Sequence, residues 1–466
     1  MHFRVLLVCL IVGASLVFAR DTPAMTGLDA QTKERLLESV RSLSAFEGRQ
    51  SGTPGGDAAA AYIAQRLPAA VIQTFPIDPV MTSTVQAEIK SGGRMSTLVN
   101  GVDFLPVLSG AGTAKISAPV VFVGYGITDP ENGLNEYQNL PVTGAIVLFL
   151  RGQPTGYQGR FAHIDKVKAA KARGAVGYLT VTGPVLSAYE QRRGMTTQPV
   201  AFYTGESGSA LPGLWITPAV GDLLLKPISI SLELFQLESR SRSSETGSTL
   251  TLTMHQRRLT STAANVIGFL PGSDPELQQE TVVLGAHYDH FGKQGGILFP
   301  GADDNASGTA VLLEVARALT GKVRTKRSII FVAFAGEEQG LLGSKAYISQ
   351  PLRPLHLTTS MINVDHVVAG NGMIAIGLSG IGKSIAQAAG EGTGLRDRIE
   401  LFGFFPGGDH VPFKEAGVAT AAIFSSGAHP DFHRPSDTPD RISPEILVSA
   451  AQYTLAVLVL LANLDP

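Results

Sequence analysis

The strongest constraint on the fold is a regular alternation of apolar runs and helical segments from about residue 253 onward. Five runs have the length and composition of buried strands, namely NVIGFLPG, TVVLGA, SIIFVAFAG, SMINVDHV and ATAAIFSS. Helical patterns lie between several of them, among them SGTAVLLEVARALTG, EEQGLLGSKAYISQ and GKSIAQAAGEG. This order predicts an α/β fold built on a doubly wound, mostly parallel sheet with helices on both faces.

Residues 91–252 have a different pattern and interrupt that domain. Short β-branched runs such as PVVFVGYGI, GAIVLFLRG and GAVGYLTV are separated by Gly and Pro, with one Lys/Ala-rich helix, DKVKAAKARGA. This pattern predicts a small β-rich inserted domain over residues 91–252. The α/β domain is then discontinuous and consists of residues 24–90 and 253–466.

The first 19 residues have the pattern of a secretory signal peptide. Arg4 precedes an apolar run from Val5 to Phe18, and small side chains precede a cleavage point after Ala19. We therefore expect export to the periplasm or the extracellular medium, with an uncleaved N-terminal anchor as the alternative. The single cysteine is Cys9, so the mature chain would contain none, which excludes disulfides, thiolate metal ligands and a cysteine nucleophile.

Charge and hydropathy exclude two classes of partner. Lys and Arg total 37 against 39 Asp and Glu, a net charge of −2, whereas nucleic-acid binding requires clustered basic residues. The apolar segment SPEILVSAAQYTLAVLVLLANL is interrupted by Ser449, Gln452 and Thr454, which favours a core helix over a membrane span. We expect no nucleic-acid partner and no stable membrane association after signal cleavage.

Side chains that can bind a cation follow or flank several of the predicted strands. They are His287, Asp289 and His290 after TVVLGA, Asp303 and Asp304 before the next helix, Glu337 and Glu338 after SIIFVAFAG, Asp365 after SMINV, and His433 after ATAAIFSS. Each alone has an ordinary explanation, such as a helix cap or a hydrogen-bonded loop histidine. Together we expect them to meet at one edge of an open sheet. So many carboxylates in one place require cations to balance their charge. Imidazole and carboxylate ligands without thiolates suit Zn²⁺.

Five sequence blocks, in order, resemble a known family. GAHYDHFG, PGADDNASGTA, FAGEEQGLLGS, INVDHV and DFHRPSDT are similar to the signature set of the co-catalytic zinc aminopeptidases, metallopeptidase family 28, of the bacterial leucyl aminopeptidase and aminopeptidase Y type. FEGRQSGTPGGDAAAAYIAQRL resembles the N-terminal segment of that family, and the middle zone resembles an inserted protease-associated domain. The resemblance implies an exported zinc-dependent exopeptidase, most simply an aminopeptidase acting on peptide substrates.

The same resemblance implies a role for each site residue and two Zn²⁺ ions per chain. The implied metal ligands are His287 and Asp365 for one ion, Glu338 and His433 for the other, and Asp304 as the bridge between them. Glu337 would be the general base, and Asp289 would orient the imidazole of His287. The family also implies a cis peptide bond between Asp304 and Asn305.

Some positions depart from the family pattern, and other functions stay open. Phe432 stands where several members have Tyr, and Gly408 stands where Ser is usual, while His290, His366 and His410 have no assigned role. The alternatives are a carboxypeptidase on the same scaffold, a glutaminyl cyclase-like transferase with one zinc, and a non-catalytic binding protein. The preferred residue, the substrate terminus and the oligomeric state are not fixed by these patterns.

Overall fold

The computed structural model describes residues 28–159, 161–187, 190–191, 195–204, 211–238, 243–322 and 324–465, with the backbone only for residues 79–81. The expected signal peptide, residues 1–19, lies outside the described residues.

The sheet that carries the site is mostly parallel, as predicted. Its strands, in spatial order, are β17 (Ile399–Phe402), β16 (Ile374–Ser379), β18 (Ala419–Ser425), β15 (Thr358–Val364), β11 (Thr281–His287), β14 (Ser328–Phe334) and β10 (Ser244–Leu270). The four strands β18, β15, β11 and β14 are mutually parallel, whereas β16 runs antiparallel to β18 and β10 runs antiparallel to β14. The expected α/β sheet is therefore confirmed.

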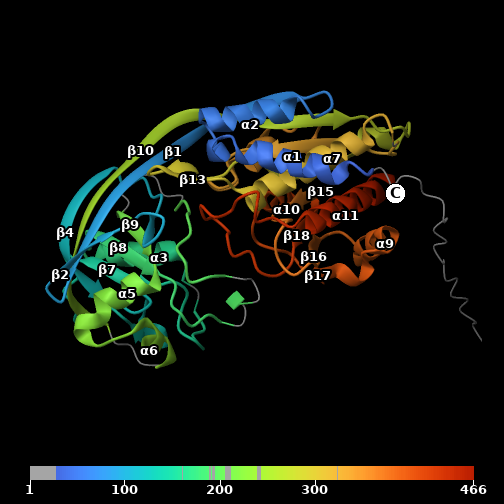
Figure 1. Cartoon of the computed structure of the whole chain (residues 1–466). Helices are drawn as coiled ribbons and strands as arrows, with labels where there is room; N and C mark the ends of the chain where they lie inside the picture. Colours follow the sequence, from blue (N-terminus) through green and yellow to red (C-terminus); the bar gives the residue numbers. More distant parts are fainter. Residues whose placement is uncertain are drawn as a thin grey trace, which may run out of the picture.

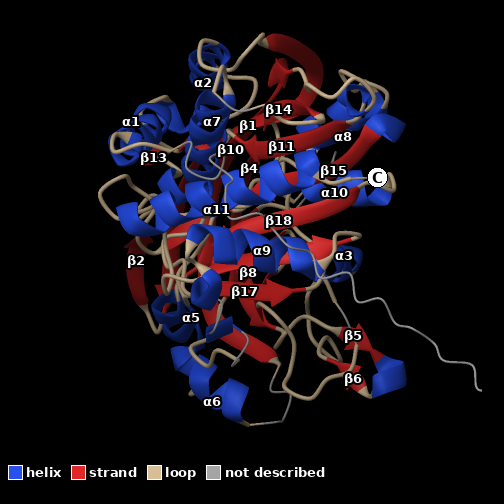
Figure 2. Cartoon of the chain, turned by 90° about the vertical axis from the view of Figure 1, so that its right-hand side faces the viewer, coloured by secondary structure: helices blue, strands red, loops and turns tan. Residues whose placement is uncertain are grey.

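Helices cover both faces of this sheet because its strands are apolar on both sides. In β14, Ile329, Phe331 and Ala333 join the larger core, while Ile330, Val332 and Phe334 join a second core on the opposite face. The helices of this part of the chain are α1 (Thr32–Ser44), α2 (Pro54–Ala64), α7 (Gly308–Leu319), α8 (Leu342–Ser349), α9 (Lys383–Thr393), α10 (His410–Glu415) and α11 (Pro444–Asn463). Figures 1 and 2 show α1, α7 and α11 stacked along the sheet.

Helix α11 is a core helix. Ser443 caps it by accepting a hydrogen bond from the N–H of Ile446, and Pro444 occupies its first turn. Among the described residues it is the one helix long and apolar enough to cross a membrane, but most of that stretch is buried against the sheet and α7. Its apolar composition is accounted for by this packing.

Two long strands connect the two parts into which the sequence is expected to divide: residues 28–90 and 253–465, called the catalytic part after the implied activity, and residues 91–252, called the inserted region. Strand β1 (Val71–Ser91) pairs antiparallel with β10 along most of its length, with a register shift between Ile77 and Val80. The N-terminal half of β10 also pairs with β4 (Thr113–Phe122), and its C-terminal end pairs with β14, so that one sheet runs through both regions (Figure 1). The expected boundary between residues 252 and 253 falls inside β10 and stays a prediction.

The inserted region combines parallel strands with helices. Beyond β4 lie β7 (Ile146–Leu150), β8 (Gly177–Val181) and β9 (Gly213–Ile216), all parallel, and then β3 (Phe104–Pro106), which is antiparallel to β9. Its helices are α3 (His163–Ala172), α5 (Pro218–Leu225) and α6 (Leu232–Leu237), and its short strands are β2 (Arg94–Leu98), β5 (Thr128–Asp129) and β6 (Leu134–Asn135). A hairpin of β12 (Gly292–Gln294) and β13 (Ile297–Phe299) belongs to the catalytic part.

The structure refines the fragment needed to test independent folding of the inserted region. Its core includes Ala87 and Ile89 of β1 and Met254 of β10, all outside residues 91–252. A fragment of residues 82–257 keeps these residues and the paired ends Thr82 and Arg257 of the two strands. We expect this fragment to unfold cooperatively in urea, because two apolar clusters of this region lie wholly within it.

The shorter fragment, residues 91–252, lacks the strand that pairs with β2 and should unfold at lower urea concentration. Equal midpoints for the two fragments would contradict a structural role of β1 in this region. An unfolded 82–257 fragment would show that the inserted region depends on the catalytic part.

Candidate metal centre

The proposed site residues come together where the parallel strands end. His287 is the last residue of β11, Asp365 follows β15 directly, and Glu337 and Glu338 lie three and four residues beyond the end of β14. Asp304 lies in the irregular turn Ala302–Ser307 before α7. Because the carboxyl ends of parallel strands share one edge, side chains from distant parts of the sequence meet there.

Asp304 is the centre of the cluster. The Nε2 atom of His287 lies 3.2 Å from Oδ1 of Asp304 and 3.3 Å from Oδ1 of Asp365. On the other side, the Nε2 atom of His433 lies 2.9 Å from Oδ2 of Asp304 and 3.2 Å from Oε2 of Glu338. The five predicted ligands therefore form two groups that share Asp304.

The second nitrogen of each imidazole fixes its tautomer. The Nδ1 atom of His287 lies 3.2 Å from the main-chain oxygen of Asp289, and the Nδ1 atom of His433 lies 3.0 Å from that of Ala201. A carbonyl oxygen can only accept a hydrogen bond, so Nδ1 carries the proton, and in the neutral ring a lone pair on Nε2 faces the carboxylates. Neither oxygen of Asp304 has a hydrogen-bond donor with acceptable geometry among the described residues.

This donor set fits divalent cations. Lone pairs that face one another in a buried site need positive charge between them, which protons or metal ions can supply. Burial lowers the pKa of His287, but the charges of Asp365 and Glu337 outweigh it and raise the pKa well above its usual range. Burial raises the pKa of Asp304, but the nearby histidines hold it well below its usual range. Nitrogen and oxygen ligands without sulfur are compatible with zinc.

Glu337 and Asp289 are linked to the same cluster. The main-chain N–H of Glu337 donates to Oδ1 of Asp289 at 3.1 Å. The Asp289 carboxylate is 3.8 Å from Nδ1 of His287, so the closer contact to that ring is the main-chain carbonyl. Burial, together with the charges of Glu338, Asp409 and Asp365, raises the pKa of Glu337 well above its usual range, and bound cations would oppose this shift.

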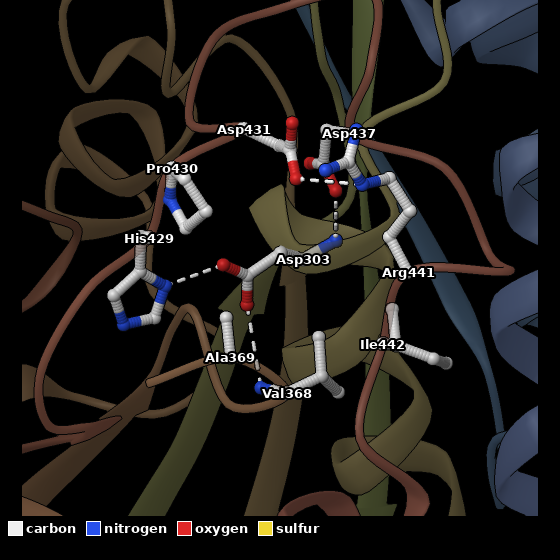
Figure 3. Close-up of a pocket in the computed structure, with 9 residues that line it drawn as sticks. All are labelled: Asp303, Val368, Ala369, His429, Pro430, Asp431, Asp437, Arg441 and Ile442. Carbon is white, nitrogen blue, oxygen red and sulfur yellow. Dashed lines mark hydrogen bonds and ion pairs between the residues drawn. The ribbon is translucent and has the colours of Figure 1, made fainter. Parts of the chain in front are cut away.

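The side chain of Asp303 is held by two hydrogen bonds outside the group of five predicted ligands (Figure 3). Its side chain accepts hydrogen bonds from Nδ1 of His429 and from the N–H of Val368. Burial lowers the pKa of His429, but the Asp303 charge raises it to about 9, and its Nε2 donates to the main-chain oxygen of Ser425. Both imidazole nitrogens are thus occupied, and the pair is an ion pair rather than a metal group.

The expected cis peptide bond between Asp304 and Asn305 is confirmed.

Two buried ionisable side chains that sequence reasoning left unassigned hold the backbone around the centre. The carboxylate of Asp437 accepts the main-chain N–H group of Asp303, at 2.8 Å (Figure 3), and that of Asp304, at 3.1 Å. The guanidinium of Arg49 is fully buried and donates to four main-chain oxygens, those of Leu43, Tyr288, Pro300 and Gly301. Asp437 lies in the family block DFHRPSDT and Arg49 in FEGRQSG. Their place in these blocks is the feature of the sequence that could have indicated a role at the site.

The residues left open in the sequence also have identifiable contacts. Nδ1 of His290 lies 2.6 Å from Oε1 of Glu338, and Nε2 of His410 donates to the main-chain oxygen of Phe405. The ring of Phe432 stacks on His433 at a centroid distance of 3.7 Å. Gly408 has φ +98°, and a Cβ there would lie 3.0 Å from Nδ2 of Asn363, which explains why glycine replaces the usual serine.

Replacing Asp437 with Asn should weaken metal binding, because one of the two acceptor oxygens at this position is lost. In Asp437→Asn, one amide N–H faces a main-chain N–H group of the Asp303–Asp304 turn, so the bridging carboxylate loses its fixed position. Loss of such an outer contact typically lowers metal affinity about 10–100-fold. Competition with a chromophoric chelator measures this effect.

The matched control is Asp440→Asn, an exposed carboxylate three residues further along the chain. It should bind zinc as the unaltered protein does. Equal affinities for the two variants would show that Asp437 does not position the bridge.

Comparisons with known proteins agree with this fold. Residues 265–458 match the sequence profile of Peptidase family M28. Aminopeptidase YwaD of Bacillus subtilis (strain 168) is 32% identical over 207 residues, 42% of this chain and 44% of that protein. A probable leucine aminopeptidase of Arthroderma otae is 29% identical over 196 residues, 39% of this chain and 54% of that protein. The chain thus spans about half the length of these curated relatives.

Solved structures extend the similarity of fold to nearly the whole chain. The aminopeptidase from Aneurinibacillus sp. strain AM-1 superimposes with a TM-score of 0.68 at 23% identity, covering 95% of this chain and 96% of that one. BSAP, a zinc aminopeptidase from Bacillus subtilis, gives 0.65 at 24% identity, covering 92% and 95%. The profile match to Peptidase family M28 covers residues 265–458, a stretch that includes every proposed ligand and Glu337.

Proposed function

We propose that this protein is an exported, zinc-dependent exopeptidase, an aminopeptidase that removes N-terminal residues from peptides. The observation that carries the proposal is the pair of imidazole Nε2 atoms that face the two oxygens of buried Asp304. Relatives named as aminopeptidases, and a fold shared with a zinc aminopeptidase, support the same activity.

Two Zn²⁺ ions would be held by the five clustered side chains. His287 and Asp365 would hold one ion, Glu338 and His433 would hold the other, and Asp304 would contact both. Bound zinc supplies Lewis acidity, which polarises the scissile carbonyl and lowers the pKa of water. His290, hydrogen-bonded to Glu338, would orient that carboxylate.

Glu337 would act as the general base. Its carboxylate would accept a proton from the attacking water and then deliver it to the amine of the departing peptide. Asp289 would keep Glu337 in place by accepting its main-chain N–H. Phe432 has no hydroxyl group, so the donor that Tyr provides in several family members is not available from this position.

Export and the choice of substrate belong to the same proposal. Export rests on the signal-peptide pattern of residues 1–19, and after its cleavage we propose no stable membrane association and no nucleic-acid partner. Peptides with a free N-terminus are the proposed substrates. A cyclase-like activity fits less well, because its single zinc would use one group of ligands, whereas two groups share Asp304 here.

A panel of matched peptides tests the reaction. We expect hydrolysis of peptides with a free α-amino group and no hydrolysis of the same peptides after N-acetylation. Removal of metal with a chelator should abolish the reaction, and addition of about two equivalents of Zn²⁺ should restore it. Cleavage of the N-acetylated peptides from their C-terminal end would instead support a carboxypeptidase.

Replacing the base should separate proton transfer from metal binding. Glu337→Gln keeps the size of the side chain but cannot accept the proton, so kcat should fall about 10²–10⁴-fold with little change in zinc content. The neighbouring variant Glu338→Gln should instead lose zinc. A Glu337→Gln enzyme with near-normal kcat would eliminate Glu337 as the base.

A further inference from the structure

A segment of the inserted region reaches the metal centre. Ala201 lies in the described stretch of residues 195–204, and its N–H donates to the main-chain oxygen of His433 at 2.9 Å. In return, Nδ1 of His433 donates to the main-chain oxygen of Ala201 at 3.0 Å. Two hydrogen bonds, one in each direction, thus join this segment to a candidate metal ligand more than 200 residues away.

His433 needs such support because of its backbone conformation. Its φ of +54° lies in the left-handed region, which side-chain-bearing residues seldom adopt unless the surroundings enforce it. The N–H of Ala201 holds the carbonyl of His433, while the carbonyl of Ala201 holds its ring. Backbone and side chain of the ligand are therefore fixed by the same residue.

The inserted region in turn fixes Ala201. The ring of Phe202 packs edge-to-face on Trp215, at 5.3 Å, and on His163, at 5.0 Å. The main-chain oxygen of Phe202 accepts the N–H of Leu108, and Thr204 donates back to Leu108. These partners all lie in the inserted region.

The segment also contacts the catalytic part beside the site. The ring of Tyr203 stacks on Phe291 at 5.3 Å, and Phe291 packs against the ring of His433 at 4.7 Å. The Tyr203 hydroxyl accepts a hydrogen bond from Nε2 of Gln50. The segment is therefore anchored on both sides of His433.

The two candidate zinc sites differ in which part of the chain supplies the acceptor for Nδ1 of the histidine ligand. The Nδ1 atom of His287 uses the main-chain oxygen of Asp289, two residues away in its own loop. The Nδ1 atom of His433 uses an oxygen that the inserted region supplies. Among the described residues, His433 is thus the one of the two imidazole ligands whose Nδ1 acceptor comes from the inserted region.

We propose that the segment of residues 199–204 supports one zinc site, because Ala201 positions the ligand His433. Zinc affinity at the Glu338–His433 site then depends on the inserted region. The inference rests on the proposed function, since it takes His433 to be a zinc ligand. Outer-shell acceptors of this kind set the tautomer and direction of a metal-bound imidazole. Ala201 and its anchor Phe202 are positioning residues.

Phe202→Ala in the full chain removes the anchor without touching the ligands. Zinc titration against a chromophoric chelator should show one of the two sites weakened about 10–100-fold and the other unchanged. The matched control is Phe161→Ala, which removes an aromatic ring that packs on Tyr157 in the same region. The Phe161→Ala protein should bind zinc as the unaltered protein does. Tyr203→Phe keeps the ring that stacks on Phe291, so its zinc affinities should also be close to those of the unaltered protein.

Hydrogen exchange in the unaltered protein gives a second readout that does not depend on a variant folding. If the segment stabilises one zinc, that zinc must stabilise the segment by the same factor. Exchange within residues 195–204 should therefore slow when zinc fills the Glu338–His433 site. Unchanged exchange on zinc loading, or two normal sites in a folded Phe202→Ala protein, would overturn the inference and leave the proposed function intact. A protein that binds no zinc would overturn both.

Discussion

Two imidazole nitrogens face the two oxygens of one buried carboxylate, Asp304, and this arrangement is stable only with positive charge between them. The rest of the catalytic part positions the side chains that surround Asp304. Parallel strands deliver His287, Asp365 and the Glu337–Glu338 pair to one edge of the sheet, and the turn before α7 brings Asp304 between them. A sheet packed on both faces helps to keep these side chains out of water. Their charges interact more strongly in the protein interior than they would in water.

Main-chain groups carry much of the positioning. Asp437 holds the N–H groups of the Asp303–Asp304 turn, and Arg49 joins the carbonyl oxygen of Leu43, in α1, to those of Tyr288, Pro300 and Gly301. The carbonyl oxygens of Asp289 and Ala201 fix the two imidazoles. Because each of these groups is buried, leaving any of them without its partner costs about 1–3 kcal/mol, which makes the arrangement rigid.

Much of this centre could be predicted from the sequence, because strand ends in an alternating α/β pattern must share one edge. The fold class and the meeting of His287, Asp304, Glu338, Asp365 and His433 follow from that rule and from the family blocks. The contact of Ala201 with His433 could not be predicted, because a main-chain carbonyl leaves no residue-type signal. The continuity of β10 across residue 253 was hidden for a related reason: its alternating polar and apolar residues look the same on either side of that position. Asp437 and Arg49 were visible as residues, but their partners are set only by the folded chain.

The central claim is that two metal ions share the carboxylate of Asp304. Anomalous diffraction at the zinc absorption edge, from crystals grown with Zn²⁺, tests it most directly. The account predicts two anomalous peaks, one beside His287 and Asp365 and the other beside Glu338 and His433, with one oxygen of Asp304 bonded to each. A single peak in fully loaded crystals, or two ions bridged by Asp303 instead, would contradict it.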